Sequence, residues 1–118
     1  MLLAIEDGTL ITVAFEDQEL HNTCIELDKA ELAFGGLNAG ALVTFISEAH
    51  AFANVQELMD FLGDQITILA DDSLSVSIGS DYGAALVVTG KRFERDADRR
   101  IIWSSVTRLK LVTISRVS

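Results

Sequence analysis

The sequence predicts an α+β fold in which an antiparallel β-sheet of about five to six strands carries one or two helices, at about residues 39–62, on one face. Two patterns lead to this prediction. Apolar residues recur at helical spacing between residues 39 and 62, whereas the flanking segments alternate with period two or form short apolar runs. The chain has 118 residues and no proline, so we expect a single domain over residues 1–118 without a rigid linker.

The first expected element is a β-hairpin over residues 2–15. Asp7-Gly8 is a strong signal for a two-residue hairpin loop, because both loop positions require positive φ. Both faces of the resulting ribbon are apolar, whereas a hairpin with one solvated face alternates apolar and polar residues. We therefore expect a helix to cover one face and a second sheet or subunit to cover the other. Residues 16–19 indicate a polar connection, and residues 22–27 a third, weaker strand.

Two consecutive helices, or one bent helix, are expected over residues 39–62. Asn38 is the expected N-cap of the first stretch, after a glycine-rich entry. Asn54 restarts the helical pattern, with Glu57 three residues later as in a capping box. Gly63 is the expected stop.

The rest of the chain favours strands. Ile66 and Ile68 lead to a turn at Asp71-Asp72, residues 73–78 alternate serine with apolar residues, and residues 84–89 form an apolar run. A charged hairpin tip at 94–100 then precedes a strand over 101–115. Its alternation breaks at 104–105 and at 111–112, which predicts a bulge or bend. A terminal helix is the competing interpretation.

The charge is strongly negative and unevenly distributed. There are 18 acidic and 9 basic residues, with a net charge of −9. Residues 1–90 contain 15 of the acids and a single base, Lys29, whereas residues 91–118 contain 8 bases and 3 acids. Either the basic end neutralises acidic strands of the same fold, or an acidic face meets a basic partner.

Several classes of protein are disfavoured. A single cysteine excludes an intrachain disulfide framework, and no apolar run approaches the roughly 18 residues of a membrane span. The first residues turn acidic at once, unlike a secretion signal. We therefore expect a cytoplasmic protein that does not associate with a membrane.

No motif predicts a metal or cofactor. His21-x-x-Cys24 is at most half of a zinc site, because zinc needs three or four converging ligands and a strand points these two residues to opposite faces. Cys24 paired with His50 or His21 is the minimum for a cysteine nucleophile, without local support. The loop at 35–40 lacks the spacing and lysine of a phosphate-binding loop.

The basic end offers one further possibility. Phe93 and Trp103 lie among its arginines, as in a strip that binds single-stranded nucleic acid. The net charge of −9 opposes direct binding to nucleic acid.

The function hypothesis that follows is a small acidic binding or inhibitor protein without enzymatic activity. Immunity proteins, antitoxins and anti-restriction or anti-CRISPR inhibitors mask a basic surface of a protein partner in this way. The carboxylates would pair with the partner's lysines and arginines and would steer association. The expected partner-binding residues are Glu16, Asp17, Glu19, Glu26, Asp28, Asp71, Asp72 and Asp81.

Two alternatives stay open. The apolar content and the two-faced hairpin also fit a homo-oligomer that is structural or binds a small ligand. A small enzyme is less favoured, and it would need His50, Glu48 or a nearby aspartate in a pocket beside the helix.

Overall fold

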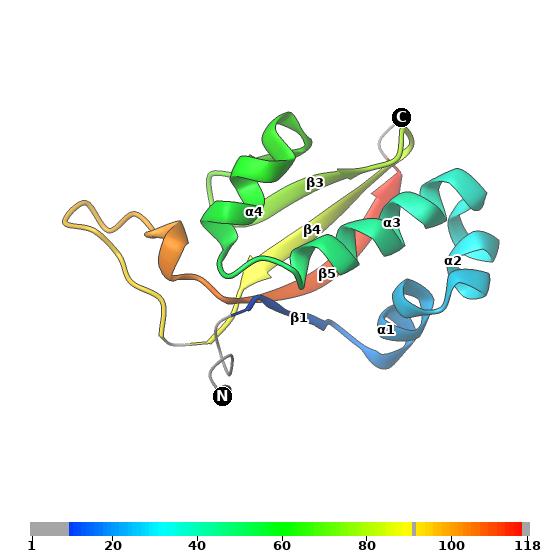
Figure 1. The fold of residues 1–118 in the computed structure, drawn as a ribbon, viewed down its shortest axis with the longest axis horizontal. Helices are drawn as coiled ribbons and strands as arrows, with labels where there is room; N and C mark the ends of the chain where they lie inside the picture. Colours follow the sequence, from blue (N-terminus) through cyan, green and yellow to red (C-terminus); the bar gives the residue numbers. More distant parts are fainter. Residues whose placement is uncertain (1–9, 91, 117–118) are drawn as a thin grey trace.

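The computed structural model describes residues 10–90 and 92–116, and over these ranges it has four α-helices and a five-stranded mixed sheet (Figure 1). The α+β class is therefore confirmed. The helices are α1 (Gln18–Ile25), α2 (Leu27–Phe34), α3 (Gly36–Ala49) and α4 (Val55–Leu62). The strands are β1 (Thr12–Phe15), β2 (Ile66–Ile68), β3 (Leu74–Ile78), β4 (Tyr82–Val88) and β5 (Arg108–Arg116).

The sheet has the order β1-β5-β4-β3-β2. The pairs β2–β3, β3–β4 and β4–β5 are antiparallel, as expected, but β1 pairs with β5 in parallel. The expected antiparallel pairing is therefore confirmed from β2 to β5, and the parallel pair of β1 with β5 makes the sheet mixed. Two parallel strands are not joined by a tight turn, so no local sequence signal predicts their pairing. The expected hairpin loop at Asp7-Gly8 lies outside the described residues.

The expected break in the last strand is confirmed as a β-bulge. Ala85 pairs with Thr113 and Leu86 with Leu111, so Val112 is the extra residue. The other break, at residues 104–105, falls in a short 3-10 helix (Trp103–Ser105), so the strand begins only at Arg108. The competing terminal helix is wrong.

Helices α3 and α4 correspond to the expected stretch at 39–62. Half of the expected capping box of α4 is present, because Glu57 N–H donates to Asn54 Oδ1 at 3.0 Å. The Glu57 side chain accepts from Ala53 N–H, one residue before the N-cap, at 3.1 Å. Gly63 ends α4 with a positive φ of 58°. Asn38 is not the N-cap of α3, because that helix already begins at Gly36 and Asn38 is buried within it.

Residues 16–34 differ most from the expectation. Instead of a polar connection and a strand they form α1 and α2. Asp17 is the N-cap of α1, where its Oδ1 accepts a hydrogen bond of 2.8 Å from Leu20 N–H. Cys24 is the buried residue of α1 and Ala30 that of α2. The expected strand at 22–27 was wrong.

The core lies between the helices and one face of the sheet. Side chains that alternate along β3, namely Leu74, Val76 and Ile78, are buried against Leu42 of α3 and Leu58 of α4. The helices α3 and α4 lie over this face in Figure 1, as expected from the sequence. The serines of β3 alternate with the buried residues and so point to the opposite face.

Candidate binding surface on helices α1 and α2

The eight acidic residues expected to bind a partner do not form one patch. Five of them lie on the segment that leads from β1 through α1 to α2, and Asp81 lies in the turn between β3 and β4. Asp71 and Asp72 lie in the turn between β2 and β3. Since these two turns are at opposite ends of β3, the structure separates Asp71 and Asp72 from Asp81.

Asp71 and Asp72 act within their own turn. Asp71 Oδ1 accepts hydrogen bonds from Ser73 N–H at 3.1 Å and Ser73 Oγ–H at 2.5 Å. These hydrogen bonds lower the pKa of the Asp71 carboxyl. The bond from the Ser73 hydroxyl has the larger effect, and the bond from the Ser73 backbone N–H the smaller one. Asp72 has a positive φ of 67°, and its Oδ2 lies 3.6 Å from Arg95 Nη1. Both residues therefore have a structural role that needs no partner.

Asp81 also has an internal contact. Asn38 Nδ2–H donates to Asp81 Oδ2 at 3.1 Å and to the Phe34 carbonyl at 3.0 Å. The buried Asn38 amide thus connects α2, α3 and the turn that follows β3. Asp81 holds these elements together at the end of the sheet where α2 meets α3.

The α1–α2 segment carries the densest negative charge. Residues 16–34 contain six acidic residues and one base, Lys29. Glu26 lies 3.6 Å from Lys29, and Glu16 lies 2.9 Å from Lys110 of β5. Among the described residues, Glu19 and Asp28 have no basic side chain within 4.0 Å. Partial neutralisation by the basic end therefore occurs, but it leaves these two carboxylates available.

A concave surface runs along these helices. One part, of about 640 Å³, is lined by Glu19, Asn22 and Thr23 of α1 and by Lys29, Leu32 and Ala33 of α2. A second part, of about 310 Å³, shares Glu19, Thr23 and Ala33 and continues to Asp17, Leu20, Phe34 and residues 112–114 of β5. We call these two parts together the α1–α2 groove.

Large apolar side chains are exposed on α1, on α2 and in the first turn of α3. Leu32, which lines it, is 89% exposed, and Leu37 in the first turn of α3 is 92% exposed. Ile25 and Leu27, at the junction of α1 and α2, are about half exposed. Asp28 lies one helical turn before Leu32 and so shares its helix face. A contiguous exposed apolar patch rimmed by polar residues is typical of a surface that binds another molecule.

The groove is fixed to the sheet by aromatic contacts. The ring of Phe34, at the end of α2, meets Tyr82 of β4 edge-on with centroids 4.9 Å apart. Phe15, at the end of β1, meets His21 of α1 in the same way at 5.1 Å. Each of the two helices is therefore held against a strand by one aromatic contact.

The residues considered for catalysis do not assemble into a reactive group. His21, His50 and Asp17 share a cavity of about 420 Å³ whose other lining residues carry no hydroxyl or thiol. Glu48 lines a different cavity, with Phe61. Cys24 is 1% exposed, and burial raises the pKa of its thiol to about 11, so the nucleophilic thiolate is scarce at neutral pH.

The described part of the chain contains neither a cluster of metal ligands nor a helix that could span a membrane. No group of three or more histidines, cysteines, aspartates or glutamates is arranged to hold a metal ion within residues 10–90 and 92–116. Within the same ranges, every helix is too short or too polar to cross a bilayer. Comparison of the chain with protein-family models, with curated proteins and with solved structures finds no match.

Sequence reasoning missed Leu32 and Leu37. Leu27, Ala30 and Phe34 have the i, i+3 and i+7 spacing of a helix face, and this signal predicts α2. Leu32 falls outside that face, so a helix assigned here would have placed it towards solvent.

Proposed function

We propose that this chain is a non-enzymatic binding protein that docks a basic protein partner in the α1–α2 groove and thereby masks the partner's cationic surface. The observation that carries the proposal is Leu32, which is 89% exposed while it lines a groove that also contains Glu19. Within residues 10–90 and 92–116, the Glu19 carboxylate has no basic side chain within 4.0 Å. The class of immunity proteins, antitoxins and related inhibitors works by such masking. A free, buried cysteine suits a reducing compartment, and we propose a cytoplasmic location for this activity.

The chemistry of the groove defines the partner's contact surface. Burial of Leu32 supplies affinity, because removing apolar area from water is favourable. Glu19 and Asp28 supply charge selection and faster encounter with a cationic surface. The expected counterpart is therefore an apolar side chain flanked by lysine or arginine.

A display library of random peptides tests this proposal. Peptides selected on the wild-type protein are expected to combine lysine or arginine with leucine or an aromatic residue. Glu19→Gln is expected to weaken the best peptide and reduce the salt dependence of its affinity. Asp64→Asn is the matched control, because Asp64 is an exposed carboxylate in the 3-10 helix after α4, outside the groove. Equal effects of the two variants would contradict the proposal.

Self-association is a second candidate function, favoured by the edge of the sheet. Within the described residues, β2 pairs only with β3, and Ile68 and Leu69 are 45% and 43% exposed along that edge. An open strand edge is a template for pairing with another chain. Light scattering over a range of concentrations tests this: a mass that stays at 12.8 kDa excludes it.

A further inference from the structure

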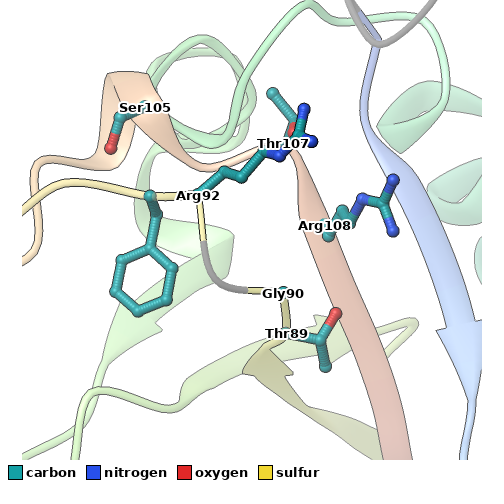
Figure 2. A pocket seen from close by; sticks show the side chains of 7 residues that line it. Thr89, Gly90, Arg92, Ser105, Thr107 and Arg108 are labelled. Carbon is teal, nitrogen blue, oxygen red and sulfur yellow. The ribbon is translucent and has the colours of Figure 1, made fainter.

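A further cavity lies at the start of β5, at the opposite end of this strand from Arg116. It has a volume of about 390 Å³ and lies where the end of β4 and the start of β5 meet the segment that follows Arg92. Figure 2 shows the side chain of Arg92 extending towards Thr107. Arg108 follows Thr107 directly in the sequence. The lining residues are Thr89, Gly90, Arg92, Phe93, Ser105, Thr107 and Arg108.

The charge of this lining is the opposite of that of the whole protein. It contains two guanidinium groups and no carboxylate, in a chain of net charge −9. Within the described residues, neither Arg92 nor Arg108 has a carboxylate within 4.0 Å. The same holds for Arg99, Arg100 and Arg116, but Arg92 and Arg108 line one cavity together. Two guanidinium groups that line one cavity, without a carboxylate in its lining, are suited to an anionic ligand.

The backbone at Arg108 is held by the end of β4. Thr89 N–H donates to the Arg108 carbonyl at 3.0 Å, which holds the end of β4 on β5. Gly90 has a φ of 85°, and a Cβ added there would lie 3.3 Å from Arg108 Cδ. A glycine therefore lets the chain turn closely over the stem of Arg108.

The hydroxyl groups of the lining have different roles. Ser105 Oγ–H donates to the Ile102 carbonyl at 2.6 Å, and the same oxygen accepts from Glu94 N–H at 2.7 Å. Ser105 therefore fixes the wall of the cavity. Thr89 and Thr107 are half-buried and contribute hydroxyl groups of the kind that complete an oxyanion site beside arginine.

We propose that this cavity binds the phosphate group of a small phosphomonoester, a role independent of the partner binding proposed above. A guanidinium offers parallel N–H donors that match phosphate oxygens. A volume of about 390 Å³ suits a small molecule. A nucleic acid is disfavoured, because its many phosphates would meet the acidic remainder of the surface.

Isothermal titration with inorganic phosphate and with adenosine monophosphate tests the proposal. Saturable binding of at least one of the two probes is expected. Arg108→Gln and Arg92→Gln are each expected to weaken it about tenfold, since each removes charge-assisted hydrogen bonds. Arg116→Gln is the matched control, because Arg116 is an exposed arginine at the far end of the same strand, stacked on Tyr82.

Three results would overturn the proposal. They are the absence of saturable binding by either probe, an equal loss in the Arg116→Gln control, and tighter binding of single-stranded RNA than of adenosine monophosphate. Arg92→Gln keeps the test valid if Arg108→Gln impairs folding, because Arg92 lies in an exposed segment outside the strands.

Discussion

Replacing Leu32 and Leu37 by alanine separates binding from folding. With Leu32 89% exposed and Leu37 92% exposed, only about a tenth of each side chain is covered. Full burial of a leucine stabilises a protein by about 1.5–3 kcal/mol, so the covered tenth contributes about 0.2–0.3 kcal/mol. Alanine also keeps a favourable helix propensity. The free energy of unfolding should therefore change by less than about 0.5 kcal/mol in the double variant.

Binding should respond differently. If the partner buries each leucine fully, alanine removes about 2 kcal/mol of apolar burial at each position. This corresponds to about thirtyfold weaker affinity for each single variant. The contrast between unchanged stability and lost affinity is the signature of a docking residue.

Urea denaturation followed by circular dichroism gives the stability, and fluorescence anisotropy with a selected basic peptide gives the affinity. Leu42→Ala is the control for a buried leucine: Leu42 is 0% exposed, and its truncation should cost about 2–5 kcal/mol. A loss above about 1 kcal/mol in the double variant would refute the reasoning, because it would show that these leucines are already covered in the free protein.

Three further predictions concern the fold. Asn38→Ala should lower the free energy of unfolding by about 2 kcal/mol in urea denaturation, because it removes two hydrogen bonds of a buried amide; a change below about 0.5 kcal/mol would contradict this. Gly79→Ala should cost about 1–3 kcal/mol by the same measurement, since its φ is +62° and the new Cβ would overlap Asn38 Oδ1; an unchanged midpoint would count against it. Stability should also fall as the pH rises from about 9 towards about 11, since the Cys24 thiol ionises near its usual pKa of 9.0 when unfolded but only near about 11 when folded. Cys24→Ala should lose this part of the pH dependence, and an identical pH profile in the variant would show that Cys24 is not its source.

The alternating strands were predictable because their burial pattern is local. In β3, serines alternate with Leu74, Val76 and Ile78, and the structure buries those three. The break at 111–112 was also visible, because a bulge adds one residue and disturbs the alternation of its own strand. Asn54 and Glu57 predicted the start of α4, because their hydrogen bonds lie within a single turn.

The features that the sequence did not predict depend on residues far away along the chain. The parallel pairing of β1 with β5 joins Val13 to Leu109, and nothing near either residue encodes that choice. Asn38 resembles an N-cap, but its amide is bound to Asp81, 43 residues away. Only the fold brings that acceptor close enough to favour a buried asparagine over a cap.

The candidate site was predictable in its charge and not in its shape. Acidic residues are dense in 16–34, and five of the eight expected binding residues lie there. Asp71 and Asp72 were included on charge alone, although an aspartate in a turn often bonds to its own backbone, as Asp71 does. The sequence analysis did not identify Leu32, because the exposure of this leucine can be predicted only once residues 27–34 are known to form a helix.

Chemical-shift mapping by NMR tests the docking claim most directly. A selected basic peptide is titrated into isotope-labelled protein, and the amide shifts are followed residue by residue. We expect the largest shifts within residues 18–34, at α1 and α2. Shifts confined to the turn at 71–73 or to the segment 92–108 would contradict it.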